Sequence, residues 1–446
     1  MQLTSSAYLN FLAAVFFLYW GVARWRLASM ALVLLANYWF YALWDLVYLA
    51  VIPAASLIDY LCARAMGTNK ARGLWMAISL VTNLGVLASF KYVDHGWILP
   101  LGLSFYCFQA LSYTIDVYRK DAKPTTSLLA HFTAVSLFPT ILAGPIARVA
   151  NLIPQLEKPK KLSPEDGGKA LFLIGLGAMK KLLVADYLGE NLVNRVFDFP
   201  NLYSGVEVLA GVYGYALQLY FDFSGYSDVA IGSALLLGLK LPQNFNMPYA
   251  AQNIAMFWQR WHMSLSSWLR DYLYFSFPGL RGTWMPYVAL IMTMVLGGLW
   301  HGATWNFLIW GTLHGVGLAV CRAWQSWRGN KKWDSAWGRG LACFWTVQFV
   351  CLGWVFFRAS SVENAMDVLN RIASLTPGAS NLSGTILSIA ALAIAGHYWP
   401  KGWFERGQAA FTKAPFFAQA ALLALLAYGI EYVAATGSAP FVYSQF

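Results

Sequence analysis

Residues 284–321 read WMPYVALIMTMVLGGLWHGATWNFLIWGTLHGVGLAVC, and this stretch decides the class of fold. Two apolar runs, 284–300 and 303–321, are each long enough to cross a bilayer and are separated only by His301 and Gly302. An ionisable side chain at membrane depth is costly and marks a functional site by default. Imidazole is also the side chain best suited to proton transfer near neutral pH. The stretch therefore predicts a membrane protein with His301 as a candidate functional residue.

The composition of the whole chain supports this interpretation. Of its 446 residues, 59% are hydrophobic and 11% are charged, whereas about a quarter of the residues in a soluble domain are charged. The net charge of +11 would point to nucleic acid in a soluble protein. In a membrane protein, basic residues in short loops set the topology instead. We therefore predict an all-α polytopic membrane protein, a single integral-membrane domain over residues 1–446, with no nucleic-acid partner.

Apolar stretches of spanning length recur along the chain. They cover residues 7–23, 27–44, 46–63, 74–90, 98–117, 128–147, 205–222, 284–300, 303–321, 340–357, 383–398 and 415–434. Residues 168–190 and 226–276 are also apolar but are interrupted by charged residues, which is typical of short, tilted or re-entrant helices. The chain is therefore expected to have about 10 to 13 transmembrane helices plus short re-entrant helices.

The middle of the chain departs from ordinary membrane spans. Residues 220–228, YFDFSGYSD, carry two carboxylates within an aromatic run, and residues 241–249, LPQNFNMPY, contain two prolines. Irregular backbone at membrane depth is tolerated only where it is buried in protein or lines a wet cavity. These segments therefore predict a core built around a polar tunnel. Lys180 and Lys181, which precede them, fit the pattern of interfacial anchors.

The basic residues predict the orientation of the chain. Loops after the first, third and fifth spans are basic, whereas those after the second and fourth carry acidic or neutral residues. Since basic loops stay cytoplasmic, the N-terminus is expected outside and the loop from Arg322 to Arg339 inside. Counting the later spans places the C-terminus outside as well. A further cytoplasmic loop, with Lys158, Lys160 and Lys161, can attract an acidic carrier or the phosphates of coenzyme A.

A second histidine in aromatic surroundings is His262, within FWQRWHMSLSSWLRDYLY at residues 257–274. It precedes His301 by 39 positions (301 − 262), and one helix of that length would measure about 58 Å, twice a bilayer core. The Pro278-Gly279 breaker therefore puts the two histidines on different elements, from which they can converge on one cavity. A lone histidine on an apolar face is more often a satisfied core residue. We interpret three others in that way: His95, His131 and His397.

Other catalytic and metal-binding patterns are absent from the sequence. His314 lies 13 residues (314 − 301) beyond His301, about 220° around an ideal helix, so the two do not share a face. There is no HExxH pair, nucleotide loop or Gly-x-Ser-x-Gly elbow, and we predict no metal site. Arg270 and Asp271 allow two interpretations: an interfacial Arg–Asp contact, or a cationic lining that attracts an anionic donor.

Several short motifs can be compared with known families as a set. They are PLGLSFY at 100–106, IDVYR at 115–119, LAGPI at 142–146, YFDFSGYSD at 220–228, NFN at 244–246, RWH at 260–262 and WHG at 300–302. Together they resemble the membrane-bound O-acyltransferase family. The bacterial branch that they resemble contains the alginate O-acetylation membrane subunit and the D-alanyl transferase of teichoic acid. The resemblance covers about residues 90–360.

The resemblance implies a fold and a site. The implied fold is a ring of tilted helices around a thinned centre, with a tunnel that joins the two sides of the membrane. His301 matches the family's catalytic histidine, and His262 matches its second active-site position, which is Asn in some branches. Residues around these positions are the candidates for substrate contact and tunnel lining: Trp300, Asn306, Arg270, Asp271, Gly298 and Gly302.

The implied function is transfer of an acyl group from a cytoplasmic thioester toward a hydroxyl. We expect an exopolysaccharide O-acyltransferase of the alginate-biosynthesis type, in a bacterial inner membrane, that moves an acetyl group across the membrane. Its donor, acetyl-CoA or an acyl carrier, is a substrate, and no tightly bound cofactor is expected. The expected partners are membrane lipid, a polysaccharide acceptor and an extracytoplasmic O-acetylation protein. The alternatives are D-alanyl transfer from a carrier protein to teichoic acid, and a transporter or flippase that uses the same tunnel.

Overall fold

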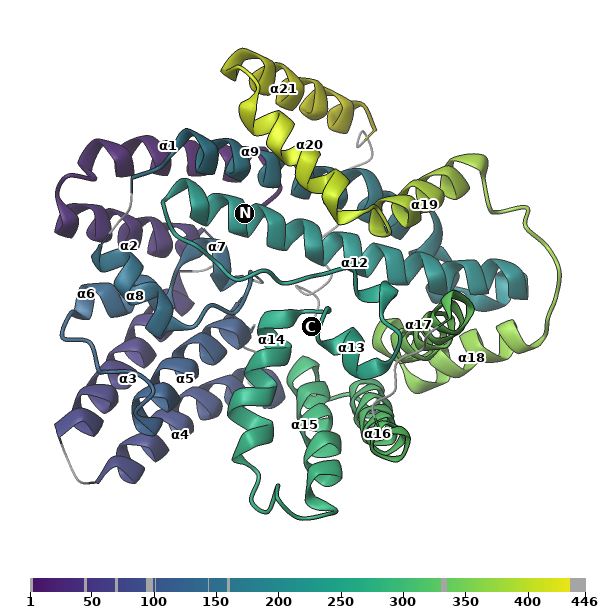
Figure 1. The fold of residues 1–446 in the computed structure, drawn as a ribbon, viewed down its shortest axis with the longest axis horizontal. Coiled ribbons are helices and arrows are strands. Elements are labelled where there is room, and N and C mark those ends of the chain that lie inside the picture. Colours follow the sequence, from purple (N-terminus) through teal and green to yellow (C-terminus); the bar gives the residue numbers. More distant parts are fainter. Residues whose placement is uncertain are drawn as a thin grey trace. The chain divides into compact units, whose positions relative to one another are not determined.

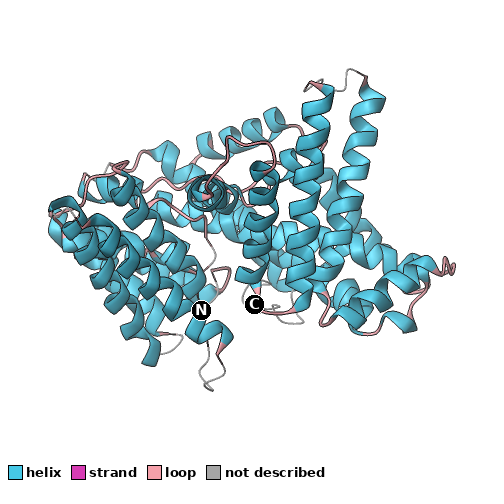
Figure 2. Ribbon diagram, turned by 90° about the horizontal axis from the view of Figure 1, so that it is seen from below, coloured by secondary structure: helices cyan, strands magenta, loops and turns pink. Residues whose placement is uncertain are grey.

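The computed structural model is built of helices joined by loops (Figure 2). It describes residues 3–43, 46–68, 71–93, 99–100, 102–142, 144–158, 161–329 and 335–433. No strand occurs within these ranges, so the predicted all-α class is confirmed. Three parts of the chain named in the sequence predictions lie outside the described residues. They are His95, Lys160 and the C-terminal end.

The chain divides into two compact units. The first comprises Met1–Ala178, Tyr226–Gln243 and Gln408–Leu422. The second comprises Met179–Gly225, Asn244–Gly407 and Leu423–Phe446. Both candidate histidines, His262 and His301, belong to the second unit. The expectation of one integral domain over 1–446 stays a prediction.

The first unit begins with a series of apolar helices (Figure 1). They are α1 (Ser6–Val22), α2 (Arg26–Ala42), η1 (Val47–Ala50), α3 (Val51–Thr68), α4 (Arg72–Tyr92), α5 (Leu103–Arg119), α6 (Leu128–Val135), α7 (Phe138–Ile141), α8 (Val149–Glu157) and α9 (Pro164–Met179). Helices α3, α4 and α5 pack against one another. The buried Asp59 carboxylate of α3 accepts hydrogen bonds from Ser79 Oγ at 2.7 Å and Asn83 Nδ2 at 2.9 Å, both of α4.

The apolar run over residues 128–147 does not form one continuous helix. Helix α6 ends at Val135, and α7 is a separate short helix with Pro139 in its first turn. Proline has no backbone N–H to continue a preceding helix, but it fits the start of a new one. A second proline, Pro145, lies in the irregular backbone that comes after α7. Mean hydropathy averages over such a break, so residues 128–147 have the hydropathy of one continuous apolar helix.

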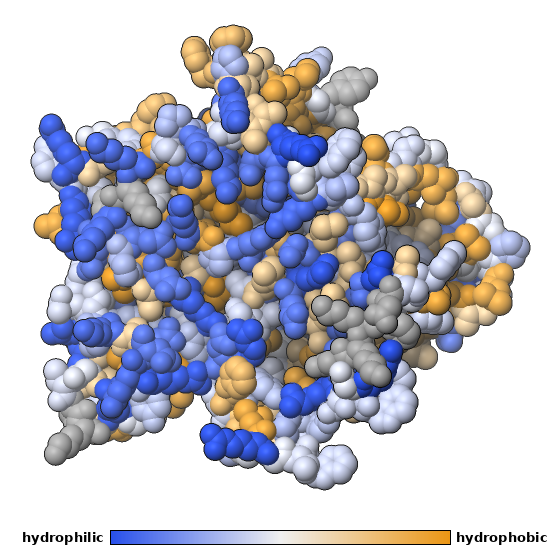
Figure 3. Space-filling model, viewed as in Figure 1, coloured by the Kyte–Doolittle hydropathy of each residue, from blue (hydrophilic) through white to orange (hydrophobic). Residues whose placement is uncertain are grey.

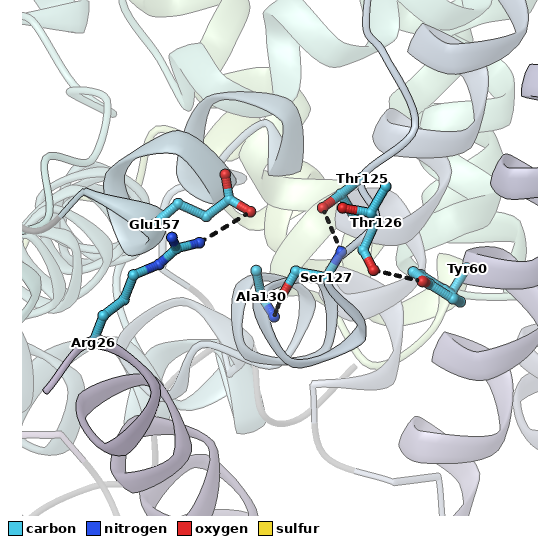
Figure 4. Close-up of polar contacts among 7 residues, drawn as sticks. All are labelled: Arg26, Tyr60, Thr125, Thr126, Ser127, Ala130 and Glu157. Atoms are coloured by element: carbon cyan, nitrogen blue, oxygen red, sulfur yellow. Dashed lines mark hydrogen bonds and ion pairs between the residues drawn. The ribbon is translucent and has the colours of Figure 1, made fainter.

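Loops at one end of the first unit are joined by polar contacts (Figure 4). Arg26, at the start of α2, lies 3.6 Å from the Glu157 carboxylate at the end of α8. The Tyr60 hydroxyl donates a hydrogen bond to the Thr126 carbonyl at 3.0 Å, and Ser127 caps α6 by accepting from the Ala130 N–H at 3.1 Å. These contacts hold the basic loops in a defined arrangement.

The second unit begins with alternating α- and π-helical turns. They are the π-turn η2 (Lys180–Ala185), α10 (Asp186–Leu188), the π-turn η3 (Gly189–Val193), α11 (Asn194–Asp198) and the 3-10 turn η4 (Pro200–Leu202). The long helix α12 (Gly205–Leu236) is next and contributes residues 205–225 to this unit. Short elements come after it: η5 (Pro248–Ala250), α13 (Ile254–Trp258), α14 (Met263–Trp268), the π-turn η6 (Leu269–Leu273) and η7 (Tyr274–Ser276).

Longer helices complete the chain. They are α15 (Met285–His301), α16 (Trp305–Arg328), α17 (Ala336–Arg358), α18 (Val362–Ala373), α19 (Gly384–His397), α20 (Lys401–Lys413) and α21 (Phe416–Val433). Helices α15 and α16 form a hairpin and pack along each other (Figure 1). The helices on either side of His301 therefore coincide with the two apolar runs of the sequence.

Among the described residues, three helices are long and apolar enough to cross a membrane by themselves: α4, α16 and α17. Residues 401–413 and 416–431 would add a fourth as one span bent by 119°. Shorter apolar helices are α1, α15 and α19, together with the segment 128–141 that contains α6 and α7. A multi-pass membrane protein is thus confirmed, whereas the total of 10 to 13 spans, the ring and the tunnel stay predictions.

Candidate active site

His301 is the last residue of α15 and lies in an aromatic environment. Its side chain is 4% exposed. Ring centroids of Trp300, Phe307, Trp310 and Phe357 lie 4.8, 5.9, 5.2 and 5.0 Å from that of the imidazole. Such rings exclude bulk water, so a charge or dipole next to the imidazole acts more strongly than it would in solution.

His262 lies between α13 and α14 in an unusual backbone conformation. Its φ of 40° and ψ of 56° fall in the left-handed region, which only a few per cent of residues other than glycine adopt. The imidazole is buried, and its Nδ1 lies 3.0 Å from Oδ1 of Asn244. Asn244 belongs to the NFN motif at residues 244–246, but the sequence did not predict the contact between Asn244 and His262.

One aromatic cluster connects the two histidines within the second unit. Successive ring centroids along it are 4.6 to 5.4 Å apart. The cluster runs from His262 through Phe223, Phe245, Trp261, Trp354 and Phe357 to His301. The turn at Pro278 and Gly279 separates η7 from α15, so the histidines do lie on different elements, as predicted.

The other candidate residues take more varied positions. The side-chain amide of Asn306 donates to the Ala359 carbonyl at 2.7 Å and thereby ties the start of α16 to the end of α17. Arg270 pairs with its neighbour Asp271 at 2.7 Å, and the Arg270 side chain is 60% exposed. The Arg–Asp contact of the first interpretation is therefore present, at the protein surface.

Gly298 lies at the contact between α15 and α16. A Cβ atom there would collide with the backbone carbonyl of Phe307, and one at Gly302 would lie 2.5 Å from the Phe307 ring. Further along the hairpin, a Cβ at Gly311 would lie 2.5 Å from the Met294 carbonyl. Glycine is thus required for the close approach of the two helices.

Gly298 is a candidate for tunnel lining, and this packing predicts that a larger side chain there also disturbs the fold. We expect Gly298→Leu to lower the melting temperature in detergent, because overpacking costs about 1–3 kcal/mol and a backbone carbonyl cannot yield. Gly340→Leu on α17 is the matched control, since a Cβ there meets nothing within 4 Å. An unchanged melting temperature together with lost turnover would instead support a tunnel-lining role for Gly298.

Lys181 lies in a buried ion cluster that the sequence did not predict. The Lys181 ammonium lies 2.6 Å from Oδ1 of Asp186 and 2.9 Å from Oδ1 of Asp222, and all three side chains are at most 9% exposed. The interpretation of Lys181 as an interfacial anchor is therefore wrong. On an α-helix, residues five apart point about 140° away from each other. The π-turn at 180–185 brings Lys181 and Asp186 to one side, as its Asp186 N–H to Lys181 carbonyl hydrogen bond shows.

The described residues contain no group of three or more His, Cys, Asp or Glu side chains arranged to hold a metal ion. The prediction that the acyl donor binds as a substrate, without a tightly bound cofactor, stays a prediction.

Known proteins resemble this chain over most of its length. The model of the membrane-bound O-acyltransferase family matches residues 38–362. The probable alginate O-acetylase AlgI of Azotobacter vinelandii is 38% identical over 78% of this chain and 72% of its own. The peptidoglycan O-acetyltransferase of Helicobacter pylori is 35% identical over 76% and 73%. The teichoic acid D-alanyltransferase of Bacillus subtilis is 29% identical over 59% and 69%. Both candidate histidines fall within the family match.

Proposed function

This chain belongs to the membrane-bound O-acyltransferase family, and on that premise we propose that it moves an acetyl group from a cytoplasmic thioester to a polysaccharide outside the cytoplasm. It is an acyltransferase and a multi-pass membrane protein. The observation that carries the proposal is the burial of His301 among four aromatic rings, in one cluster with His262. Such a setting suits proton transfer between an alcohol and a thiolate without competing water.

In the proposed reaction His301 acts as general base and then as general acid. It takes the proton of the attacking hydroxyl, whose oxygen forms a bond to the acyl carbon. The carbon–sulfur bond of the thioester breaks, and the same proton is returned to the leaving thiolate. A positioned base of this kind contributes about 10² to 10⁴ in rate. His262 holds or polarises a substrate group beside this centre.

The named relatives support acetyl as the group transferred. Those named for O-acetylation, of alginate and of peptidoglycan, are 38% and 35% identical to this chain, whereas the D-alanyltransferase is 29% identical. Both O-acetylating relatives are named for polysaccharide acceptors. We therefore propose that this chain acts in the inner membrane of a bacterium and that its final acceptor is a polysaccharide. An extracytoplasmic partner protein completes the transfer. D-alanyl transfer to teichoic acid is the second candidate.

The donor is proposed to be attracted by exposed basic residues of the first unit. Over the elements of that unit, the face in Figure 3 is largely hydrophilic. Exposed basic residues include Arg24, Arg119, Lys120, Lys158 and Lys161. A positive surface attracts the phosphates of coenzyme A or an acidic carrier protein and speeds their encounter.

Thioester turnover by the purified protein tests the proposal. The protein in lipid nanodiscs is given acetyl-CoA or a D-alanyl carrier protein, and release of the free thiol is measured with and without glycan acceptor. Release from acetyl-CoA is the expected result. Release from the D-alanyl carrier alone would replace acetylation by D-alanylation. Movement of glycan with no thioester consumed would favour a transporter or flippase.

Both termini are predicted to be extracytoplasmic and the loop from Arg322 to Arg339 cytoplasmic, because of the distribution of basic residues. Ser6 and Ala336 are exposed, so the substitutions Ser6→Cys and Ala336→Cys each place a cysteine on one predicted side of the membrane. A membrane-impermeant maleimide applied to intact cells should label Ser6→Cys at once and Ala336→Cys only after permeabilisation. Labelling of Ala336→Cys in intact cells would show that the spans have been miscounted.

These positions avoid two residues with structural roles. Ser5 and Ser335 accept capping hydrogen bonds at the starts of α1 and α17, and loss of such a cap costs about 1 kcal/mol. Cys321 and Cys343 are the native cysteines that are partly exposed among the five. The experiment therefore uses a Cys321→Ser, Cys343→Ser background, and that parent protein is the labelling control.

A further inference from the structure

One side-chain oxygen, Oδ1 of Asn244, collects three hydrogen bonds around His262. It accepts from the Ser264 hydroxyl at 2.8 Å and from the Ser264 backbone N–H at 3.3 Å, and it lies 3.0 Å from His262 Nδ1. A backbone N–H can only donate, so the Asn244 atom that faces it is the amide oxygen and not the nitrogen. An oxygen acceptor requires a donor opposite it, so His262 Nδ1 carries a proton.

We propose that Asn244 is a positioning residue for acyl transfer, which holds His262 in its Nδ1–H tautomer. In a neutral imidazole, the second nitrogen then bears the lone pair, so Nε2 accepts a hydrogen bond from a substrate O–H group. A glycan acceptor carries hydroxyls besides the attacking one, and these provide such a donor. The inference rests on the proposed role of His262 in the reaction.

The backbone around His262 supports this role. The left-handed conformation of His262 costs about 1–3 kcal/mol and persists only where its surroundings impose it. The Met263 N–H donates to the Asn244 backbone carbonyl at 2.9 Å. Asn244 therefore holds both the imidazole and the strained backbone that aims it.

A second explanation is that Asn244 only supports the start of α14 through Ser264. The two explanations differ in what the loss of Asn244 changes. Loss of structural support lowers stability and affects substrate binding and turnover together. Loss of tautomer control leaves donor binding intact and lowers kcat, because an imidazole that has flipped or changed tautomer offers N–H where a lone pair is needed.

The test compares three variants with wild type in the nanodisc thioester assay. Asn244→Leu removes the acceptor, and kcat should fall about 10- to 100-fold with the donor KM unchanged within about twofold. Asn244→Asp keeps an oxygen at the same place and should restore kcat to within about fivefold of wild type. Asn246→Leu, at an exposed asparagine of the same loop, is the matched control and should behave like wild type.

The outcomes separate this inference from the proposed function. His262→Ala with wild-type kcat would overturn the role of His262 itself. An inactive His262→Ala beside an Asn244→Leu that matches Asn246→Leu would overturn the positioning role alone. Equal losses in Asn244→Leu and Asn244→Asp, or a raised donor KM in both, would also overturn it. If Asn244→Leu does not reach the membrane folded, Asn244→Ser, whose shorter side chain cannot reach the imidazole, is measured in its place against the same expectations.

Discussion

Replacing His301 with alanine is expected to lower acyl transfer by at least about 10²-fold while the protein is still inserted and folded. A hydroxyl attacks a thioester poorly until its proton is removed, and the resemblance to the family predicts that this histidine is the catalytic one. The surroundings of His301 are mainly aromatic, so removal of the imidazole leaves a largely apolar gap, which lowers stability but does not by itself prevent folding. The measurement is thiol release from the donor.

Two further variants sharpen this prediction. His301→Gln keeps a polar side chain of similar reach without a basic nitrogen, and it should be as inactive as His301→Ala. His314→Asn is the matched control, because His314 shares the Trp310 contact and accepts a hydrogen bond from Trp258 Nε1 at 3.3 Å that an asparagine oxygen can replace. Full activity of His301→Gln, or equal losses in both histidine variants, would contradict the assignment of the base.

Lys181→Met is expected to destabilise the second unit by about 3–5 kcal/mol, because it leaves two buried carboxylates without their ammonium. Apparent melting temperature in detergent, monitored as the amount of monodisperse protein after heating, measures the effect. Lys180→Met, one residue earlier and only partly buried, is the matched control and should change stability by less than about 1 kcal/mol.

A compensating change tests the electrostatic origin of that loss. If the cost is the burial of unpaired charge, Lys181→Met with Asp186→Asn and Asp222→Asn should be more stable than Lys181→Met alone. A triple variant that melts lower than Lys181→Met would mean that packing by the lysine stem, rather than charge pairing, stabilises this part of the protein.

Much of the architecture was accessible from the sequence. The helices α4, α16 and α17 coincide with predicted apolar runs, because a span of about 20 apolar residues needs no knowledge of its neighbours. The family resemblance was also correct, and the match over residues 38–362 confirms it. The motifs supported the resemblance because they combine glycine, proline and histidine at fixed positions, which composition alone does not produce.

The features that the sequence could not show depend on backbone detail and on distant partners. The break within residues 128–147 arises because a proline begins α7, and hydropathy averages over it. The contact between Asn244 and His262 joins residues 18 apart across a left-handed turn, for which no periodic pattern exists. The same is true of Lys181, whose nearer partner lies five positions along a helix.

The two π-turns at 180–185 and 189–193 also set limits on insertion and deletion. Each is closed by a hydrogen bond that spans five residues, from Asp186 to Lys181 and from Asn194 to Gly189. Deleting one residue there would leave a regular helix but would rotate the downstream residues by about 100°. Asp186 would then leave Lys181, and Gly189 would leave the Gln218 amide that fits against it. Chimaeras with relatives should therefore place their crossover points outside this segment, and alignments should carry no gap within it.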